Sequence, residues 1–173
     1  TPALRGPDID FAQAKPVSRE TYLAWSRRAE LRRGDVILAR EAPVGGVGYV
    51  DGSKRICLGQ RTVLVRTNAE LADPRFVYYL LQSPGPQAWM EMHSEGSTVK
   101  HLNVADVRRI ALGRLPGLDQ QRRIADVLGA LDELIRLNRT LAMRCGDLSD
   151  LVWQKAVAGI APTVSLADRA TIV

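Results

Sequence analysis

The chain has 173 residues and a formal net charge of +5, from 24 lysines and arginines against 19 aspartates and glutamates, and 46% of its residues are hydrophobic. This composition supports a packed core and excludes a wholly disordered chain. No run approaches the roughly 18 consecutive apolar residues of a membrane-spanning helix, so we expect no membrane partner. The modest basic excess is compatible with an anionic partner such as DNA, and equally with the arginine usage of a GC-rich genome.

The cysteines, Cys57 and Cys145, lie far apart in the sequence and form no metal-ligand spacing with His93 and His101. We therefore expect no metal site and a reducing, cytoplasmic location. The first residue is Thr1 rather than methionine, which we interpret as the sign of a piece or a processed form of a longer protein.

The N-terminal half is expected to combine one helix with a small sheet. Residues 18–31 have the pattern of a helix with Ser18 as its N-cap. Four short β-rich runs follow, separated by "APVGG" and by the turn sequence "DGSK"; the runs are "DVILA", "GVGYV", "RICLG" and "TVLVR". This succession predicts a compact antiparallel sheet.

Three short helices are expected next. Asp73 and Pro74 begin the first, over residues 73–81, as N-cap and first helical residue. The sequence "SPGP" is expected to end it, and "QAWMEMH" to form the second. Asn103 and Asp106 give a capping-type start to the third. Before the third helix lies "GSTVKHLNV" (residues 96–104), whose glycine, hydroxyls and lysine suit contact with phosphate oxygens.

Residues 119–159 contain no proline, and apolar residues recur there at alternating steps of three and four, interrupted by Asn138. This pattern predicts one long amphipathic helix with a coiled-coil-like seam that projects from the domain. The alternative is two shorter helices broken at "CGD", where Gly146 weakens the middle. Residues 161–173 are expected to form a strand or edge segment.

No catalytic constellation is recognisable. "DPRF" (73–76) shares only part of the adenine-binding Asp-Pro-Pro-Tyr tetrapeptide of amino-methyltransferases, and Asp73 is better explained as a helix cap. "GGVG" (45–48) lies between strands rather than before a helix, so it does not predict a dinucleotide site. "DGSK" is a turn and not a nuclease centre. We expect no catalytic residues.

Four stretches, in this order and at these spacings, resemble the target recognition domain and conserved helix of the specificity subunit of type I restriction-modification systems. They are "RRGDVILAREAPVGGVG", "CLGQRTVLVR", "GSTVKHLNVADVRRIAL" and "LPGLDQQRRIADVLGALDELIRLNR", within residues 31–143. One departure is "LPGLDQQ", where the family usually has a second proline and glutamates. The two ends resemble an internal and an opening segment of a recognition domain, so we expect a circularly offset half-subunit.

The resemblance implies an α+β fold in three parts. The first is a DNA-binding target recognition domain, residues 1–118, with a small, mostly antiparallel sheet and short helices. The second is one long projecting coiled-coil helix, residues 119–159. The third is a C-terminal segment, residues 160–173, that returns to the globular domain as a strand.

The resemblance also implies a non-catalytic DNA reader. A full specificity subunit has two recognition domains, each reading half of a split target, and two long helices that pair antiparallel. Methyltransferase subunits dock on it and methylate adenine at N6, and a translocase and nuclease subunit joins the complex. The chain itself would bind no cofactor, whereas its partner subunits use S-adenosylmethionine, ATP and Mg²⁺. A lone half would pair with a second copy or with the missing half.

The candidate site residues follow from these motifs. Candidates for contact with double-stranded DNA are Arg40, Lys54, Arg55, Gln60, Arg61, Ser97, Thr98, Lys100 and His101. Candidates for helix pairing are Leu128, Leu131, Ile135, Asn138, Leu148 and Val152. Motif residues are expected to serve backbone contact or loop architecture, and base readers to lie in residues 12–30, 51–56 and 84–95. The alternative is an interaction protein that assembles through the long helix and does not bind DNA.

Overall fold

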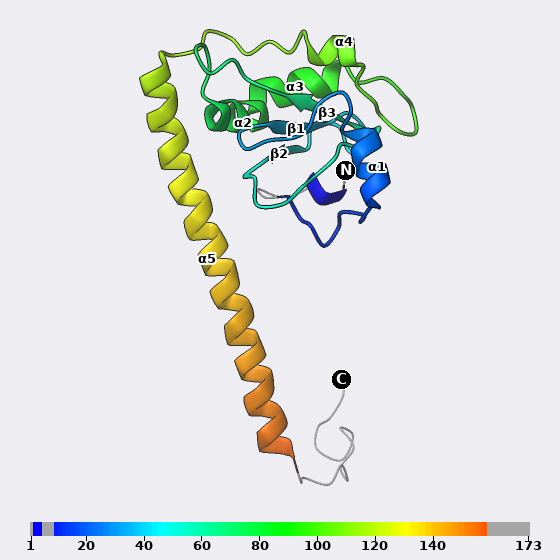
Figure 1. The fold of residues 1–173 in the computed structure, drawn as a ribbon. Helices are drawn as coiled ribbons and strands as arrows, with labels where there is room; N and C mark the ends of the chain where they lie inside the picture. The colour runs from blue at the N-terminus through cyan, green and yellow to red at the C-terminus, as the bar shows by residue number, and fades with distance from the viewer. Residues whose placement is uncertain (1, 5–8, 159–173) are drawn as a thin grey trace, which may run out of the picture. The chain divides into compact units, whose positions relative to one another are not determined.

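The computed structural model describes residues 2–4 and 9–158, in two compact units, Thr1–Ala130 and Leu131–Val173. The first unit holds a small sheet with short helices, and the described part of the second is the C-terminal part of a long helix (Figure 1). The elements are η1 (Pro2–Leu4), α1 (Arg19–Trp25), β1 (Val36–Ala39), β2 (Val47–Tyr49), β3 (Thr62–Val65), α2 (Pro74–Gln82), α3 (Pro84–Met92), α4 (Val104–Val107) and α5 (Leu118–Val157).

The sheet has three strands in the order β2-β1-β3, and both pairings are antiparallel. The register places Val36 of β1 opposite Tyr49 of β2 and opposite Val65 of β3. All four residues of β1 are buried, because side chains from other segments pack against both faces of this central strand. The predicted small antiparallel sheet is confirmed.

Helices α2 and α3 cover one face of the sheet (Figure 1). Asp73 caps α2 by accepting a hydrogen bond from the Phe76 N–H at 2.9 Å, and Pro74 lies in the first turn, as expected. Ser83 ends α2 and α3 begins at the next residue, so "SPGP" both ends one helix and begins another. The first core, on this face, consists of Val36, Leu38, Val47, Val77, Tyr78, Leu81, Met90 and Leu102.

The opposite face of the sheet carries a second, smaller core made of Leu4, Ile37, Ala39 and Val50. Gly48 makes room for it, since a Cβ atom at this position would lie 2.5 Å from Cδ2 of Leu4. The "GGVG" sequence is therefore explained by close packing within the sheet.

The run "RICLG" (55–59) is not a strand, so this part of the predicted sheet is wrong. Its apolar side chains Ile56 and Leu58 pack, half-buried, against the second core. The two edges of β1 are already occupied by β2 and β3. This run therefore contributes to the core by covering a face of the sheet rather than by extending it.

Helix α1 ends at Trp25 and not at residue 31, so the predicted helix was too long. Ser18 caps it as expected, accepting a hydrogen bond from the Thr21 N–H at 3.2 Å. The Tyr22 hydroxyl donates to Oε1 of Glu30 at 2.8 Å. Residues eight apart in a continuous helix lie about 12 Å apart along its axis, so this contact requires the chain to turn after α1.

Helix α5 runs through Gly146 without a break, which excludes the two-helix alternative. Its first turns belong to the first unit, where the buried side chain of Gln121 accepts a hydrogen bond from the Asp73 N–H at 2.9 Å and donates to the Pro116 carbonyl at 2.8 Å. A Cβ atom at Gly129 would lie 2.8 Å from the guanidinium carbon of Arg75. The predicted terminal strand, residues 160–173, lies outside the described residues.

A buried carboxylate joins the start of β1 to the end of β3. Asp35 is 1% exposed and accepts hydrogen bonds from Nε and Nη2 of Arg66, both at 2.7 Å, and from the Arg32 N–H at 2.8 Å. Burial alone would raise the pKa of Asp35, but the hydrogen bonds from Arg66 and Arg32 outweigh it and lower the pKa. Ionised Asp35 therefore stabilises the folded state.

We predict that Asp35→Asn lowers the free energy of unfolding by about 2 kcal/mol at pH 7, because it weakens hydrogen bonds to a charged group. The folded pKa lies below the unfolded value of about 3.9, so the stabilisation is full above that pH and is lost as the pH falls through the folded pKa. Urea unfolding at pH 7 and at about pH 3 should therefore show the gap between wild type and variant shrinking with acid. A gap that stays constant would contradict this role of the carboxylate.

Candidate nucleic-acid interface

Arg40, directly after β1, joins three segments that are distant in sequence. Its Nη1 donates to the Leu102 carbonyl at 2.9 Å, and its Nη2 donates to the Gln60 carbonyl at 3.0 Å. Its backbone N–H donates to the Arg61 carbonyl at 2.8 Å, and its carbonyl accepts from the Leu102 N–H at 2.9 Å. The Arg40 guanidinium, a candidate for contact with DNA, is thus hydrogen-bonded to main-chain carbonyls. These bonds favour a role in positioning the backbone of the neighbouring segments.

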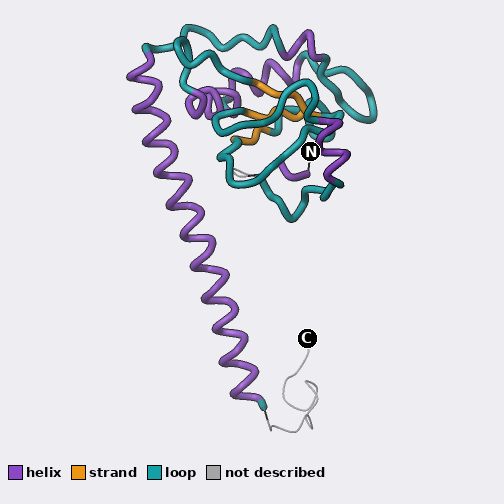
Figure 2. The backbone as a smooth tube through the Cα atoms, in the orientation of Figure 1, coloured by secondary structure: helices purple, strands orange, loops and turns teal. Residues whose placement is uncertain are grey.

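A loop connects α3 and α4 (Figure 2). A pair of backbone hydrogen bonds closes it. The Glu95 N–H donates to the His101 carbonyl at 2.9 Å, and the His101 N–H donates to the Glu95 carbonyl at 2.7 Å. Gly96 has φ +110°, and a Cβ atom there would lie 2.3 Å from the Val99 carbonyl oxygen, so the loop needs glycine at this position. Ser97 and Thr98 are exposed at its tip.

Lys100 and His101 lie at the base of this loop. The Lys100 ammonium forms an ion pair with Glu91 of α3, and both side chains are more than half exposed. His101 forms a β-bridge with Glu41 as well as with Glu95, so the loop joins the end of β1. The structure thus brings the loop of residues 95–101 next to the segment that Arg40 holds.

Gln60 and Arg61 lie on the turn before β3, which Thr62 closes by donating its N–H and its hydroxyl to the Gly59 carbonyl, at 3.2 and 2.9 Å. Arg61 is mostly exposed, with its Nε 3.4 Å from Oε2 of Glu41. Gln60 is exposed as well. Their side chains are available to a partner, while Arg40 fixes the backbone beneath them.

Lys54 and Arg55 lie on a different turn. Asp51 stabilises it by accepting hydrogen bonds from the Ser53 N–H at 2.9 Å and from its hydroxyl at 2.7 Å. The Lys54 ammonium lies 4.3 Å from the centre of the Phe11 ring, a cation–π contact. Both basic side chains are exposed, and no described hydrogen bond or ion pair joins them to the cluster around Arg40.

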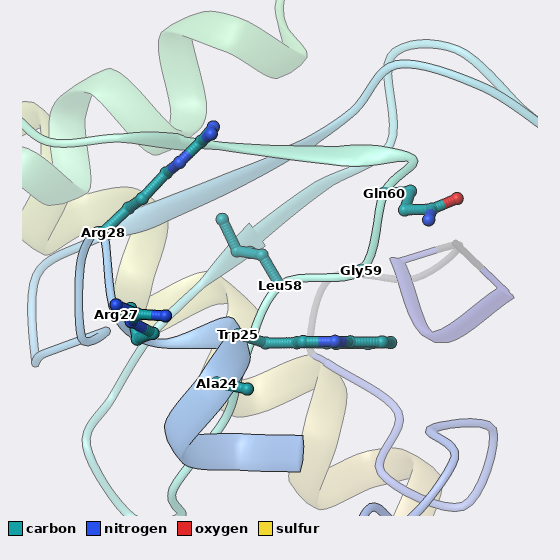
Figure 3. Close-up of a pocket in the computed structure, with 7 residues that line it drawn as sticks. All are labelled: Ala24, Trp25, Arg27, Arg28, Leu58, Gly59 and Gln60. Atoms are coloured by element: carbon teal, nitrogen blue, oxygen red, sulfur yellow. The ribbon is translucent and has the colours of Figure 1, made fainter.

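A pocket of about 620 Å³ lies beside the Gln60 turn, lined by Ala24, Trp25, Arg27, Arg28, Leu58, Gly59 and Gln60. Figure 3 shows the Trp25 indole extending from the end of α1 alongside the backbone of Leu58 and Gly59. Of these residues only Gln60 was among the sequence-based candidates. The others of α1 and its following turn fall within residues 12–30, a region expected to hold base readers, but no sequence motif singles them out.

The helix-pairing candidates divide between the two units. Leu128 is half-buried within the first unit. In the second unit Leu131, Ile135, Asn138, Leu148 and Val152 are all exposed. Leu134 and Leu141 are exposed too and fit the same steps of three and four, although the sequence-based list omitted them. A stripe of exposed apolar residues therefore runs along α5, and we call it the α5 stripe: Leu131, Leu134, Leu141, Leu148 and Val152.

Residues 2–4 and 9–158 contain neither a cluster of metal ligands nor a membrane-spanning helix. No group of three or more histidine, cysteine, aspartate or glutamate side chains is placed there to hold a metal ion. Nor is any helix in that part of the chain long and apolar enough to cross a membrane.

Residues 6–143 match the family described as type I restriction modification DNA specificity domain. The match covers most of the chain, and the chain belongs to this family. The resemblance to specificity subunits of type I restriction-modification systems is thereby confirmed.

One similar protein is the MjaX specificity subunit of a type I restriction enzyme from Methanocaldococcus jannaschii, 31% identical over 105 residues, or 61% of this chain and 24% of that protein. A chain from a structural study of complex assembly and conformational transition of the type I restriction-modification system is 26% identical, with a TM-score of 0.57 over 80% of this chain and 36% of that one. The HsdS subunit from Thermoanaerobacter tengcongensis is 29% identical, with a TM-score of 0.51 over 79% and 36%. The chain thus spans about a quarter to a third of the length of these relatives.

We predict that Arg40→Ala lowers the free energy of unfolding by about 2 kcal/mol, because two main-chain carbonyls, one of them part-buried, lose a charged donor. Amide hydrogen exchange should also speed up in residues 95–102. The matched control is Arg61→Ala, whose exposed ion pair with Glu41 should cost less than about 1 kcal/mol. Equal effects of the two substitutions in urea unfolding would contradict the positioning role of Arg40.

Proposed function

We propose that this chain recognises double-stranded DNA as a specificity subunit or half-subunit of a type I restriction-modification complex. It directs adenine-N6 methylation and restriction to a bipartite target, and it is itself non-catalytic. The observation that carries this proposal is the family match over residues 6–143. The clustering of exposed polar and basic side chains at one end of the sheet, around Arg40, supports it.

The site can bind DNA without chemistry of its own. Lys100 supplies a point charge for the phosphate backbone, and Ser97 and Thr98 supply small donors on a loop that Gly96 shapes. Gln60 and Arg61 carry the two side chains best suited to adenine and guanine edges in the major groove. Phosphate contacts position such a protein, and base contacts give it sequence preference.

A second candidate function is favoured by one observation, the exposed α5 stripe. A surface of this kind serves assembly with another helix whether or not the globular unit binds DNA. The two candidates differ in salt dependence. Only a DNA reader shows an affinity for duplex DNA that falls steeply as salt rises.

We predict that the purified chain alone transfers no methyl group from S-adenosylmethionine and cleaves no DNA. Together with its cognate methyltransferase subunit, it should direct N6-methylation of adenine within one defined motif. Sequencing the methylated bases in a host with and without this gene measures the outcome. Methyl transfer by the chain alone, or an unchanged methylation pattern, would refute the proposed role.

We also predict that Lys100→Ala weakens binding to all duplexes without changing which one is preferred. Loss of one phosphate contact should reduce the slope of affinity against salt by about one. The matched control is Glu91→Gln, which removes the partner of Lys100 and leaves its charge, so binding should be equal or tighter. A changed preference with an unchanged salt slope would show instead that Lys100 reads a base.

For the helix, we propose antiparallel pairing with a second copy, or with the other half of a full subunit. Asn138 lies within the paired face and helps to fix the register. A two-fold dimer would read a split palindrome, since protein symmetry imposes site symmetry.

We predict that Leu131→Asp converts the dimer to a monomer in light scattering at tens of micromolar, because a charge is placed in the apolar contact. The matched control is Met143→Asp, which changes another exposed apolar residue of α5 outside the α5 stripe and should leave the dimer intact. A wild-type monomer at that concentration would exclude self-pairing.

A further inference from the structure

The pocket beside the Gln60 turn combines three kinds of chemical group. Ala24, Trp25 and Leu58 form an apolar wall, Arg27 and Arg28 are cationic, and Gln60 carries a primary amide. All of these residues belong to the first unit, but they come from two segments, residues 24–28 and 58–60, that are far apart in the sequence. DNA offers complementary groups within the span of one nucleotide, namely phosphate, apolar sugar and methyl surface, and base edge.

Trp25 leaves 51% of its surface exposed, at the end of a helix that buries no residue fully. An exposed indole forgoes the stabilisation that burial of an aromatic side chain gives. Aromatic side chains in this state dominate binding energy when a partner covers them. Leu58 beside it extends the apolar surface of the pocket (Figure 3).

Arg27 and Arg28 lie on the turn after α1, and both are exposed. Neither forms an ion pair or hydrogen bond with another described residue. This adjacent couple therefore places two positive charges, with no described ionic partner, at the lining of the pocket. The planar guanidinium group matches the geometry of a phosphate.

The backbone of Gln60 is fixed by a hydrogen bond, whereas its side chain is exposed. Its carbonyl accepts a hydrogen bond from Arg40 at 3.0 Å, which fixes the main chain of the turn. The side-chain amide has no partner among the described residues and remains exposed at the pocket rim. An amide presented in this way can donate to and accept from one base edge, with adenine as the best match.

We propose that this pocket is a base-reading site for one strand of duplex DNA, with Trp25 and Gln60 as specificity-determining residues and Arg27 and Arg28 as contacts to the adjoining phosphates. This assignment rests on the proposed function. It adds where on the first unit a base is read and which residue makes each kind of contact. Trp25 and Leu58 give apolar contact to sugar or thymine methyl, and the Gln60 amide reads the base edge beside it.

The test is selection of duplexes from a random library by the full chain, followed by affinity measurements over a range of salt. Trp25→Ala and Gln60→Ala should each lose roughly tenfold in affinity for the selected duplex and relax the preference at one or two adjacent base pairs. The double variant Arg27→Gln, Arg28→Gln should weaken binding to all duplexes and reduce the salt slope by about two. Trp25→Phe, which keeps an aromatic ring, should retain most of the preference.

Two matched controls separate the pocket from general effects. Trp153→Ala removes an exposed tryptophan of the second unit, and Arg122→Gln, Arg123→Gln removes an adjacent exposed arginine pair of the first unit outside the pocket. Both should leave the selected sequence unchanged. Gln60→Ala changes only an exposed side chain and so keeps the test valid where Trp25→Ala disturbs folding.

The outcomes distinguish the two levels of the proposal. A wild-type chain that binds no duplex overturns the proposed function, and the inference with it. A wild-type chain that binds, with the same preference in Gln60→Ala and in a folded Trp25 variant, overturns the inference alone. Uniform loss of affinity in all pocket variants, with no change of preference, shows backbone contact only and also overturns the base-reading assignment.

Discussion

The ion pair between the buried carboxylate of Asp35 and the more exposed guanidinium of Arg66 is the interaction on which the first unit depends. It joins the start of the central strand to the end of β3, and the same guanidinium donates from Nη2 to the Glu30 carbonyl at 2.9 Å. The Glu30 carboxylate in turn accepts from Tyr22 of α1. A chain of hydrogen bonds therefore runs from the sheet to the helix that carries Trp25. Through Arg66 and Glu30, Asp35 thus contributes to the placement of α1 and of Trp25.

The elements that could be predicted from sequence are those whose determinants are local. Asp73 and Pro74 lie within one turn of the residues that they organise, so the start of α2 is fixed by its own sequence. The length of α1 was overestimated because its end is set by a contact between Tyr22 and a residue beyond the helix. "RICLG" has the composition of a strand, yet pairing depends on which segments already occupy the edges of β1. Such competition between segments leaves no trace in a local pattern.

The residues of the candidate site also differ in whether local sequence could predict them. Loop motifs located Gln60, Arg61 and Lys100, all of which the structure places at the surface. The role of Arg40 could not be predicted, because its guanidinium bonds carbonyls 20 and 62 positions away. The pocket was missed as a set of residues for the same reason, since Trp25 and Leu58 meet only in the folded chain. Leu134 and Leu141 carried a visible periodic signal that a different choice of seam would have found.

The two hydrogen bonds of the Arg40 guanidinium go to main-chain carbonyls and not to side chains. Every amino acid has such a carbonyl, so the hydrogen bonds of Arg40 do not depend on which side chains occupy positions 60 and 102. The backbone conformation of the surface is thereby independent of the side chains that would contact a partner. Substitutions on the turn and at the loop tip can therefore change which partner is bound, while the backbone that carries these side chains keeps its conformation. A recognition surface built in this way can evolve readily. A substitution among its exposed side chains does not require a compensating substitution in the backbone contacts that support it.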